Sequence, residues 1–185
     1  MTKYILILAV LVGGIVFAKT YLTHTENRLN AEITTAVKPS AQDSSQHFTA
    51  EDLAKIGCRV APELGKFSQV DFPLLGTVKF YALRSETGCK VDLISEISSA
   101  KENDEGSWAG VRAGASVTAR KRGFELESEE GSLGEYSEIQ HFSQNGADKG
   151  FTYTIQSKGF LHSITIFSDE VTLDDRLESV IAAKF

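Results

Sequence analysis

The sequence predicts an α+β domain, in which an antiparallel sheet, made of a hairpin and a three-stranded meander, packs against N- and C-terminal helices. Apolar and polar residues alternate with a period of two in several segments bounded by turn residues. One segment with helical spacing precedes these strands and another follows them. Hydrophobic residues make up 42% of the 185 residues and charged residues 24%, which is ordinary globular composition and excludes disordered and low-complexity classes.

The first predicted helix begins at Ala50. Thr49, followed three residues later by Asp52, forms a capping-box pattern immediately before it. We expect Gly57 or Pro62 to end the helix, near residues 58–60. So short a helix depends on tertiary contacts for its stability.

A hairpin is predicted in the segment that follows. Apolar and polar residues alternate over 77–83 and again over 89–93. Between them, Ser85-Glu86-Thr87-Gly88 is a turn sequence, with Gly88 where the backbone takes a left-handed conformation. We therefore expect two antiparallel strands around this turn.

A second helix is predicted from Trp108, with Ser107 as its N-cap. Val111 and Ala115 follow at helical spacing, and Trp108 is expected to anchor the helix in the core. The last turn carries Arg120-Lys121-Arg122, which suits the negative end of the helix dipole. The small residues along this segment would let the helix lie close to a sheet.

Three strands are predicted in the C-terminal third, over 136–143, 151–157 and 160–168, with Asn145-Gly146 and Lys158-Gly159 between them. A two-residue turn at Lys158-Gly159 fixes the register of the last two strands. It pairs Phe151 with Ile166, Tyr153 with Ile164, Ile155 with His162, and Ser157 with Phe160. The apolar members of these pairs share one face, which predicts the face that is buried.

A last helix closes the chain. We expect Thr172 and Asp175 to cap it, and Leu177 and Ile181 lie on one side of it at helical spacing. A strand pair followed by an amphipathic helix that ends in Phe185 is similar to the closing part of the PsbP type of sandwich. This resemblance covers the last third of the chain, rests on element order, and implies a fold only.

The N-terminus predicts export. Lys3 precedes an apolar stretch over 4–18, and Lys19 ends it, which is typical of a secretory leader or a short membrane anchor. The predicted organisation is a signal peptide or N-terminal membrane anchor over 1–18, to 22 if it is retained, a flexible linker over 19–48, and a single exported α+β domain over 49–185. The expected location is periplasmic or extracytoplasmic, either soluble or anchored to the inner membrane by an N-terminal helix.

Cys58 and Cys89 are the only cysteines. In an oxidising compartment such a pair is expected to form a disulfide. A redox role would favour the close CxxC spacing, and these two cysteines are far apart in the sequence. A nucleophilic role would need a free thiol, so it competes directly with the disulfide.

His162 and His141 are the candidate ligand-site residues. The predicted register places His162 on the apolar side of the meander. A metal or general-base role would need converging carboxylates or a further ligand, which the sequence does not supply. A buried histidine at the rim of the core explains the pattern equally well, so no catalytic residue, metal site or cofactor is predicted.

Charge excludes one class of partner. Lysine and arginine number 19 against 25 aspartates and glutamates, giving a net charge of -6, so nucleic acid is not an expected partner. Glutamates crowd the segment 125–138 beside the basic residues 112–122, and these two groups are expected to pair with each other or to be solvated.

These observations favour a non-catalytic exported envelope protein, a binding or accessory module for a partner protein or a small ligand whose identity the sequence leaves open. Two alternatives remain: a small periplasmic hydrolase with a site of His162 or His141 and acidic residues, and a membrane-anchored structural subunit. Enzymatic activity is uncertain at this point, and the absence of a nucleophile or nucleotide motif argues against it.

Overall fold

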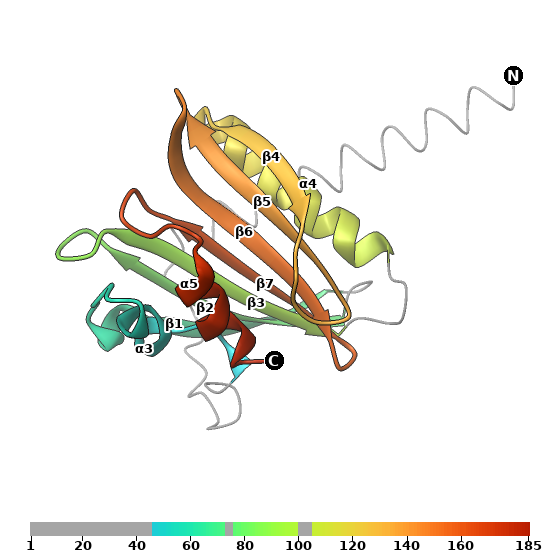
Figure 1. Ribbon diagram of the computed structural model, residues 1–185. Helices are drawn as coiled ribbons and strands as arrows, with labels where there is room; N and C mark the ends of the chain where they lie inside the picture. Colours follow the sequence, from blue (N-terminus) through green and yellow to red (C-terminus); the bar gives the residue numbers. More distant parts are fainter. Residues whose placement is uncertain (1–45, 73–75, 100–104) are drawn as a thin grey trace, which may run out of the picture.

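The computed structural model describes residues 46–72, 76–99 and 105–185 (Figure 1). The predicted leader and nearly all of the predicted linker lie outside these residues. His47 and Phe48, at the end of the predicted linker, are described and are fully buried. Within the described ranges, none of the helices combines the length and the apolar character needed to cross a membrane.

A single antiparallel sheet dominates the molecule. Its seven strands are β1 (Lys66–Phe72), β2 (Gly76–Ser85), β3 (Val91–Ser99), β4 (Glu125–Glu130), β5 (Tyr136–Gln144), β6 (Ala147–Ser157) and β7 (Phe160–Phe167). Their order in the sheet is β1-β2-β3-β7-β6-β5-β4. The predicted hairpin is the β2–β3 pair, the predicted meander is β5–β6–β7, and the two are joined by pairing of β3 with β7.

The meander has the predicted register. Phe151 pairs with Ile166 and Tyr153 with Ile164. Lys158 and Gly159 both have positive φ, 52° and 77°, as a two-residue turn between right-twisted strands requires. The alternation of side chains along the chain therefore sufficed to define this pair of strands.

The described helices are α3 (Ala50–Lys55), α4 (Glu105–Arg122) and α5 (Asp175–Ala182), with a short 3-10 turn, η1 (Pro62–Leu64). Helix α3 begins as predicted, and the Thr49 N–H donates to Asp52 Oδ2 at 2.9 Å. It ends at Lys55, earlier than the predicted 58–60. Gly57 adopts φ +95° just after the helix and ends it.

Two other helix boundaries differ from prediction. Helix α4 begins at Glu105, so Ser107 lies within it and is not its cap. The cap of α5 is Asp174, whose Oδ1 accepts a hydrogen bond from the Leu177 N–H at 2.8 Å, and not Thr172. An aspartate accepts this bond at least as well as a threonine, so the helix starts two residues later than the sequence pattern indicated.

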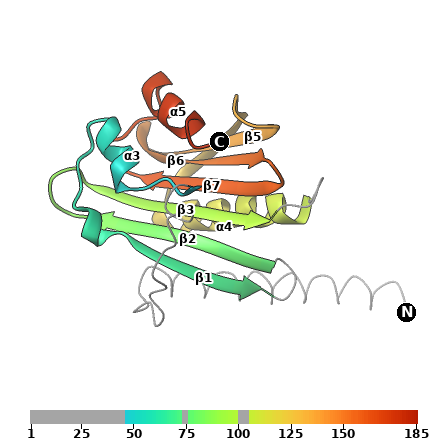
Figure 2. The same ribbon diagram turned by 90° about the horizontal axis from the view of Figure 1, so that it is seen from below.

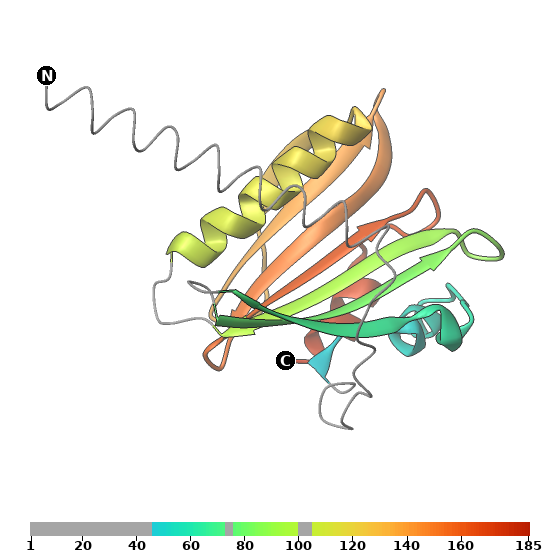
Figure 3. The same ribbon diagram turned by 180° about the vertical axis from the view of Figure 1, so that it is seen from behind.

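Helices cover both faces of the sheet. Helices α3 and α5 lie on one face, where Leu53, Leu177 and Ile181 join a core cluster with Tyr153 and Ile164 of the sheet (Figure 1; Figure 2). Helix α4 lies on the opposite face, across the strands nearest β4 (Figure 3). There its small side chains pack in a second, smaller cluster, formed by Ala115, Ala119, Phe142 and Phe167. We call these the α3/α5 face and the α4 face.

A buried carboxylate ties the two helices of the α3/α5 face together. Asp52 of α3 receives Lys55 Nζ at 2.7 Å and Lys184 Nζ, just beyond α5, at 2.8 Å. Burial by itself raises the pKa of Asp52, but hydrogen bonds from Lys184 and Lys55 outweigh it and lower the pKa below its usual value. This ion pair fixes the end of the chain against α3.

Candidate functional site

The predicted disulfide is present. Cys58 and Cys89 are bonded, with 5.3 Å between their Cα atoms. Two local structures position them. After α3, the N–H groups of Gly57 and Cys58 donate to the carbonyls of Ala54 and Leu53, which is a Schellman motif that turns the chain back at Cys58.

The second cysteine is positioned by the β2–β3 turn. Ser85 Oγ donates to the Thr87 carbonyl at 2.8 Å, and Gly88 has the predicted positive φ, 72°. Cys89 follows directly and is half-buried, whereas Cys58 is buried. The bond therefore joins the end of α3 to the start of β3.

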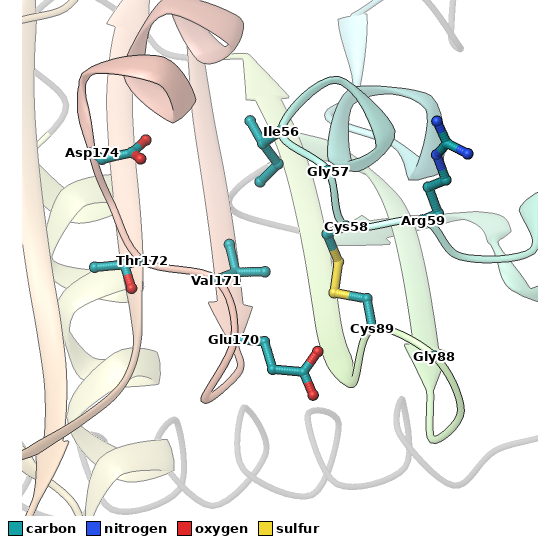
Figure 4. A pocket seen from close by; sticks show the side chains of 10 residues that line it. All are labelled: Ile56, Gly57, Cys58, Arg59, Gly88, Cys89, Glu170, Val171, Thr172 and Asp174. Atoms are coloured by element: carbon teal, nitrogen blue, oxygen red, sulfur yellow. A yellow bond between two sulfur atoms is a disulfide. The ribbon is translucent and has the colours of Figure 1, made fainter.

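A pocket of about 600 Å³ opens beside the disulfide (Figure 4). Three segments that are distant in the sequence line it: the residues after α3, the β2–β3 turn, and the connection between β7 and α5. The lining residues are Ile56, Gly57, Cys58, Arg59, Gly88, Cys89, Glu170, Val171, Thr172 and Asp174. A volume of this size is typical of small-ligand sites.

Hydrogen bonds hold the β7–α5 connection in place at one end of the pocket. Ser168 Oγ donates to the Lys90 carbonyl at 2.7 Å, and it accepts from the N–H groups of Glu170 at 3.0 Å and Val171 at 3.2 Å. One buried hydroxyl thus links this connection to the residue that follows Cys89.

A contact between helices also holds two of these segments together. A guanidinium nitrogen of Arg176, in the first turn of α5, donates to the carbonyl of Lys55, the last residue of α3. Together with Ser168 and the disulfide, this bond fixes all three segments relative to one another. A site fixed in this way loses little conformational entropy when a ligand binds.

The lining is apolar at its base and charged at its rim. Val171 and Cys58 are buried, and Ile56 and Cys89 are half-buried. Glu170 and Arg59 are exposed, and neither side chain has an ion-pair or hydrogen-bond partner among the described residues. The pocket can therefore offer apolar contact together with charged groups that are not already paired.

No family model, curated protein or solved structure matches this chain. The resemblance of the last third to the PsbP type of sandwich therefore remains one of element order.

The two candidate histidines lie outside the pocket and apart from each other. His162 of β7 pairs in register with Ile155, whereas His141 of β5 pairs with Phe151 at the other end of β6. His141 Nε2 lies 3.0 Å from Glu129 Oε1 on the exposed edge of the sheet. The structure therefore does not bring the two histidines together.

His162 is a core residue with an aromatic environment. Its side chain is 7% exposed, its ring centroid lies 4.4 Å from that of Phe185, and its Nδ1 has no hydrogen-bond partner among the described residues. Burial, with smaller effects from the charges of His47 and Lys158, lowers the pKa of His162 to about 4. The imidazole is thus neutral at physiological pH.

The basic residues of α4 are largely neutralised on the sheet. Arg112 Nε donates to Glu138 Oε2 at 2.7 Å, as the charge pattern indicated. Arg122 donates to Asp92 at 3.1 Å and lies over the Phe167 ring. Over the described ranges, no three His, Cys, Asp or Glu side chains are grouped so that they could hold a metal ion.

Proposed function

We propose that this protein is a non-catalytic exported envelope protein, a binding or accessory module whose ligand site is the pocket beside the disulfide. The observation that carries the proposal is the way the pocket is fixed. A covalent bond, the Ser168 hydroxyl and the Arg176 guanidinium hold three separate segments around one opening. Neither candidate histidine lies within this opening, which favours binding over hydrolysis as its role.

Export is supported by two independent features. A structural disulfide persists in oxidising compartments outside the cytoplasm. The apolar segment over 4–18 has the composition of a secretory leader. Intact-mass measurement of protein recovered from the cell envelope distinguishes a chain cut after Ala18 from one that keeps residues 1–22 as an anchor, and recovery of the full-length chain from the cytosol would contradict both.

The binding role is tested by filling the pocket. Glu170 is exposed and lines the pocket, so Glu170→Trp places a bulky ring at its rim without disturbing the core. Asp169→Trp is a matched control, because Asp169 is the neighbouring exposed carboxylate and does not line the pocket.

Each protein, immobilised, is exposed to an envelope extract, and retained proteins and small molecules are identified by mass spectrometry. A component retained by the wild type and by Asp169→Trp, but lost with Glu170→Trp, supports the proposal. Identical sets of retained components with all three proteins would rule out the pocket as the binding site.

A further inference from the structure

We infer that the pocket beside the disulfide takes a ligand that carries a cationic group, an ammonium or a guanidinium, on an apolar body. This inference rests on the proposed function, because it names the chemistry of the ligand for the same site. Three features carry it: the two carboxylates on one wall, the apolar base, and the direction of the one lining cation.

The carboxylates belong to the connection between β7 and α5. The side-chain carboxylate of Glu170 has no ion-pair or hydrogen-bond partner within the described ranges. Asp174 uses one oxygen, Oδ1, to cap α5, and its other oxygen is not engaged by any described residue. Figure 4 shows the Asp174 carboxylate directed toward Ile56, across the pocket.

The base of the pocket is suited to an aliphatic or aromatic body. Ile56 and Val171 border the disulfide, and Cys58 and Val171 are buried. An alkyl chain placed here would leave water and contact apolar atoms on both walls. Carboxylates lie at the rim of the pocket and apolar groups at its base. A ligand with a cationic end and an apolar body is therefore complementary to the pocket.

The charges discriminate against an anionic ligand. Arg59 is the only cation among the lining residues, it is exposed, and in Figure 4 its side chain is directed away from the β7–α5 connection. Glu170 and Asp174 would both repel an anion in the pocket, and a protein with a net charge of -6 adds to that repulsion.

The electrostatic contribution is modest because the rim is exposed to water. Pairs of exposed charges contribute about 0.2–1 kcal/mol, so loss of either carboxylate should weaken the binding of a cationic ligand by a factor of about 1.4 to 5. The apolar body of the ligand then provides the rest of the affinity. Probes that share one apolar body and differ in charge therefore isolate the contribution of the carboxylates.

The test is an NMR titration of the uniformly ¹⁵N-labelled protein with hexylammonium, 1-hexanol and hexanoate, which share a six-carbon chain and differ in charge. The amide signals of Gly57 and Gly88 report on the pocket, because both residues line it. We expect both signals to shift with hexylammonium at the lowest concentration, with 1-hexanol at a higher one, and least with hexanoate.

Two variants test the carboxylates one at a time, and a third variant is their control. Asp174→Asn removes the charge and keeps a residue that caps helices equally well, so α5 should remain intact. Glu170→Gln removes the other charge. Asp175→Asn is the matched control, since it is an adjacent exposed carboxylate that does not line the pocket. Weaker hexylammonium binding in the first two variants, with unchanged 1-hexanol binding and an unaffected control, supports the inference.

The opposing outcomes are separable. Shifts at Gly57 and Gly88 with no preference for hexylammonium over 1-hexanol would overturn the cationic ligand while leaving the pocket as a binding site. An absence of shifts at both glycines with all three probes overturns the inference, and the fate of the proposed function is then decided by the Glu170→Trp experiment.

The cation could be carried by a free amine or by a basic side chain of a partner protein. The peptide acetyl-Leu-Lys-Leu-amide and its Lys→Gln analogue distinguish these sources. Tighter binding of the lysine peptide than of hexylammonium, lost in the glutamine analogue, indicates a partner's side chain. Binding of hexylammonium without binding of the lysine peptide indicates a free amine.

Discussion

Ile164 and Thr165 are neighbours on β7 whose side chains lie on opposite faces of the sheet. Ile164 belongs to the core of the α3/α5 face. On the α4 face, Thr165 Oγ1 lies 2.9 Å from Thr152 Oγ1, the hydroxyl of its direct partner on β6. The alternation of apolar and polar residues along β7 indicates that Thr165 faces away from the larger core. It does not indicate that the Thr165 hydroxyl is paired with Thr152 on the α4 face.

Ile164→Ala should destabilise the protein by about 2–5 kcal/mol, because it removes buried methyl groups and leaves a cavity. Ile164 is 1% exposed, so no solvent can fill the space without breaking the core. Urea unfolding followed by circular dichroism measures the change. Glu127→Gln, at an exposed strand position, serves as the control and should alter stability little. Equal losses in both variants would show that burial of Ile164 is not the cause of its loss.

His162 should make the stability of the fold pH-dependent. Its pKa is lowered from 6.5 to about 4 in the folded chain, so protonation favours the unfolded chain. Stability should therefore be complete above pH 6.5 and fall, by up to about 3 kcal/mol, as the pH drops to about 4. Urea unfolding of the wild type and of His162→Leu across this range measures the effect.

His162→Leu should lose most of the change in the free energy of unfolding between pH 6.5 and about 4. If that change is the same in the variant as in the wild type, a group other than His162 causes it. Asp52 and Asp92 do not interfere. Their pKa values are lowered below 3.8, so the stability they contribute is lost only at more acidic pH.

At the scale of elements, the interior strands and the start of α3 were predictable, while the starts of α4 and α5 and the edges of the sheet were not. The predicted meander and hairpin have one face in the main core, which gives their sequences a clear period of two. The two edge strands, β1 and β4, were missed. In β4, Leu126 is the only apolar side chain among glutamates and a serine, since an edge strand near solvent needs little apolar surface.

The cap of α5 is a second point at which sequence and structure differ, and it can be tested. Asp174→Ala should cost about 1 kcal/mol, because the Leu177 N–H then loses its acceptor. Thr172→Ala, at the cap position favoured by the sequence, should change the free energy of unfolding little. Chemical denaturation of both variants decides between the two positions, and a larger loss at Thr172 would restore the sequence-based cap.

The glutamates of β4 should protect the sheet from association. Glu125, Glu127 and Glu129 are exposed along an edge that no described strand covers. Replacing all three by threonine keeps strand propensity and removes the charge repulsion between edges of separate molecules. Sedimentation velocity should then show more self-association than in the wild type, whereas an unchanged distribution would show that these charges do not guard the edge.

At the scale of the whole molecule, the disulfide was predictable and the pocket was not. An oxidising compartment and two cysteines sufficed to predict the Cys58–Cys89 bond. The β7–α5 connection reaches the pocket only because β7 pairs with β3, and this contact between distant strands leaves no local pattern in the sequence. His162 and His141 do not line the pocket, since an apolar period identifies a face of the sheet and not a cavity.

Loss of the disulfide should destabilise the whole fold by up to about 3.7 kcal/mol, because a sequence separation of 31 residues is no longer constrained in the unfolded chain. Thermal unfolding with and without dithiothreitol measures this loss. The Cys58→Ser/Cys89→Ser variant is the control, and its melting temperature should not respond to the reductant. Two free thiols in the unreduced, denatured wild type would contradict the bond.

The order of strands in the sheet also sets an order of folding events. The seam between β3 and β7 pairs Leu93 with Ile166, so it can form only after the chain has been made as far as β7. Both cysteines, α3 and the β1–β2–β3 ladder precede that point. In a chain that emerges from its N-terminus, the disulfide can close while the edge of β3 is still bare. A bond formed at that stage would restrict the incomplete sheet during the interval in which its unpaired edge favours aggregation.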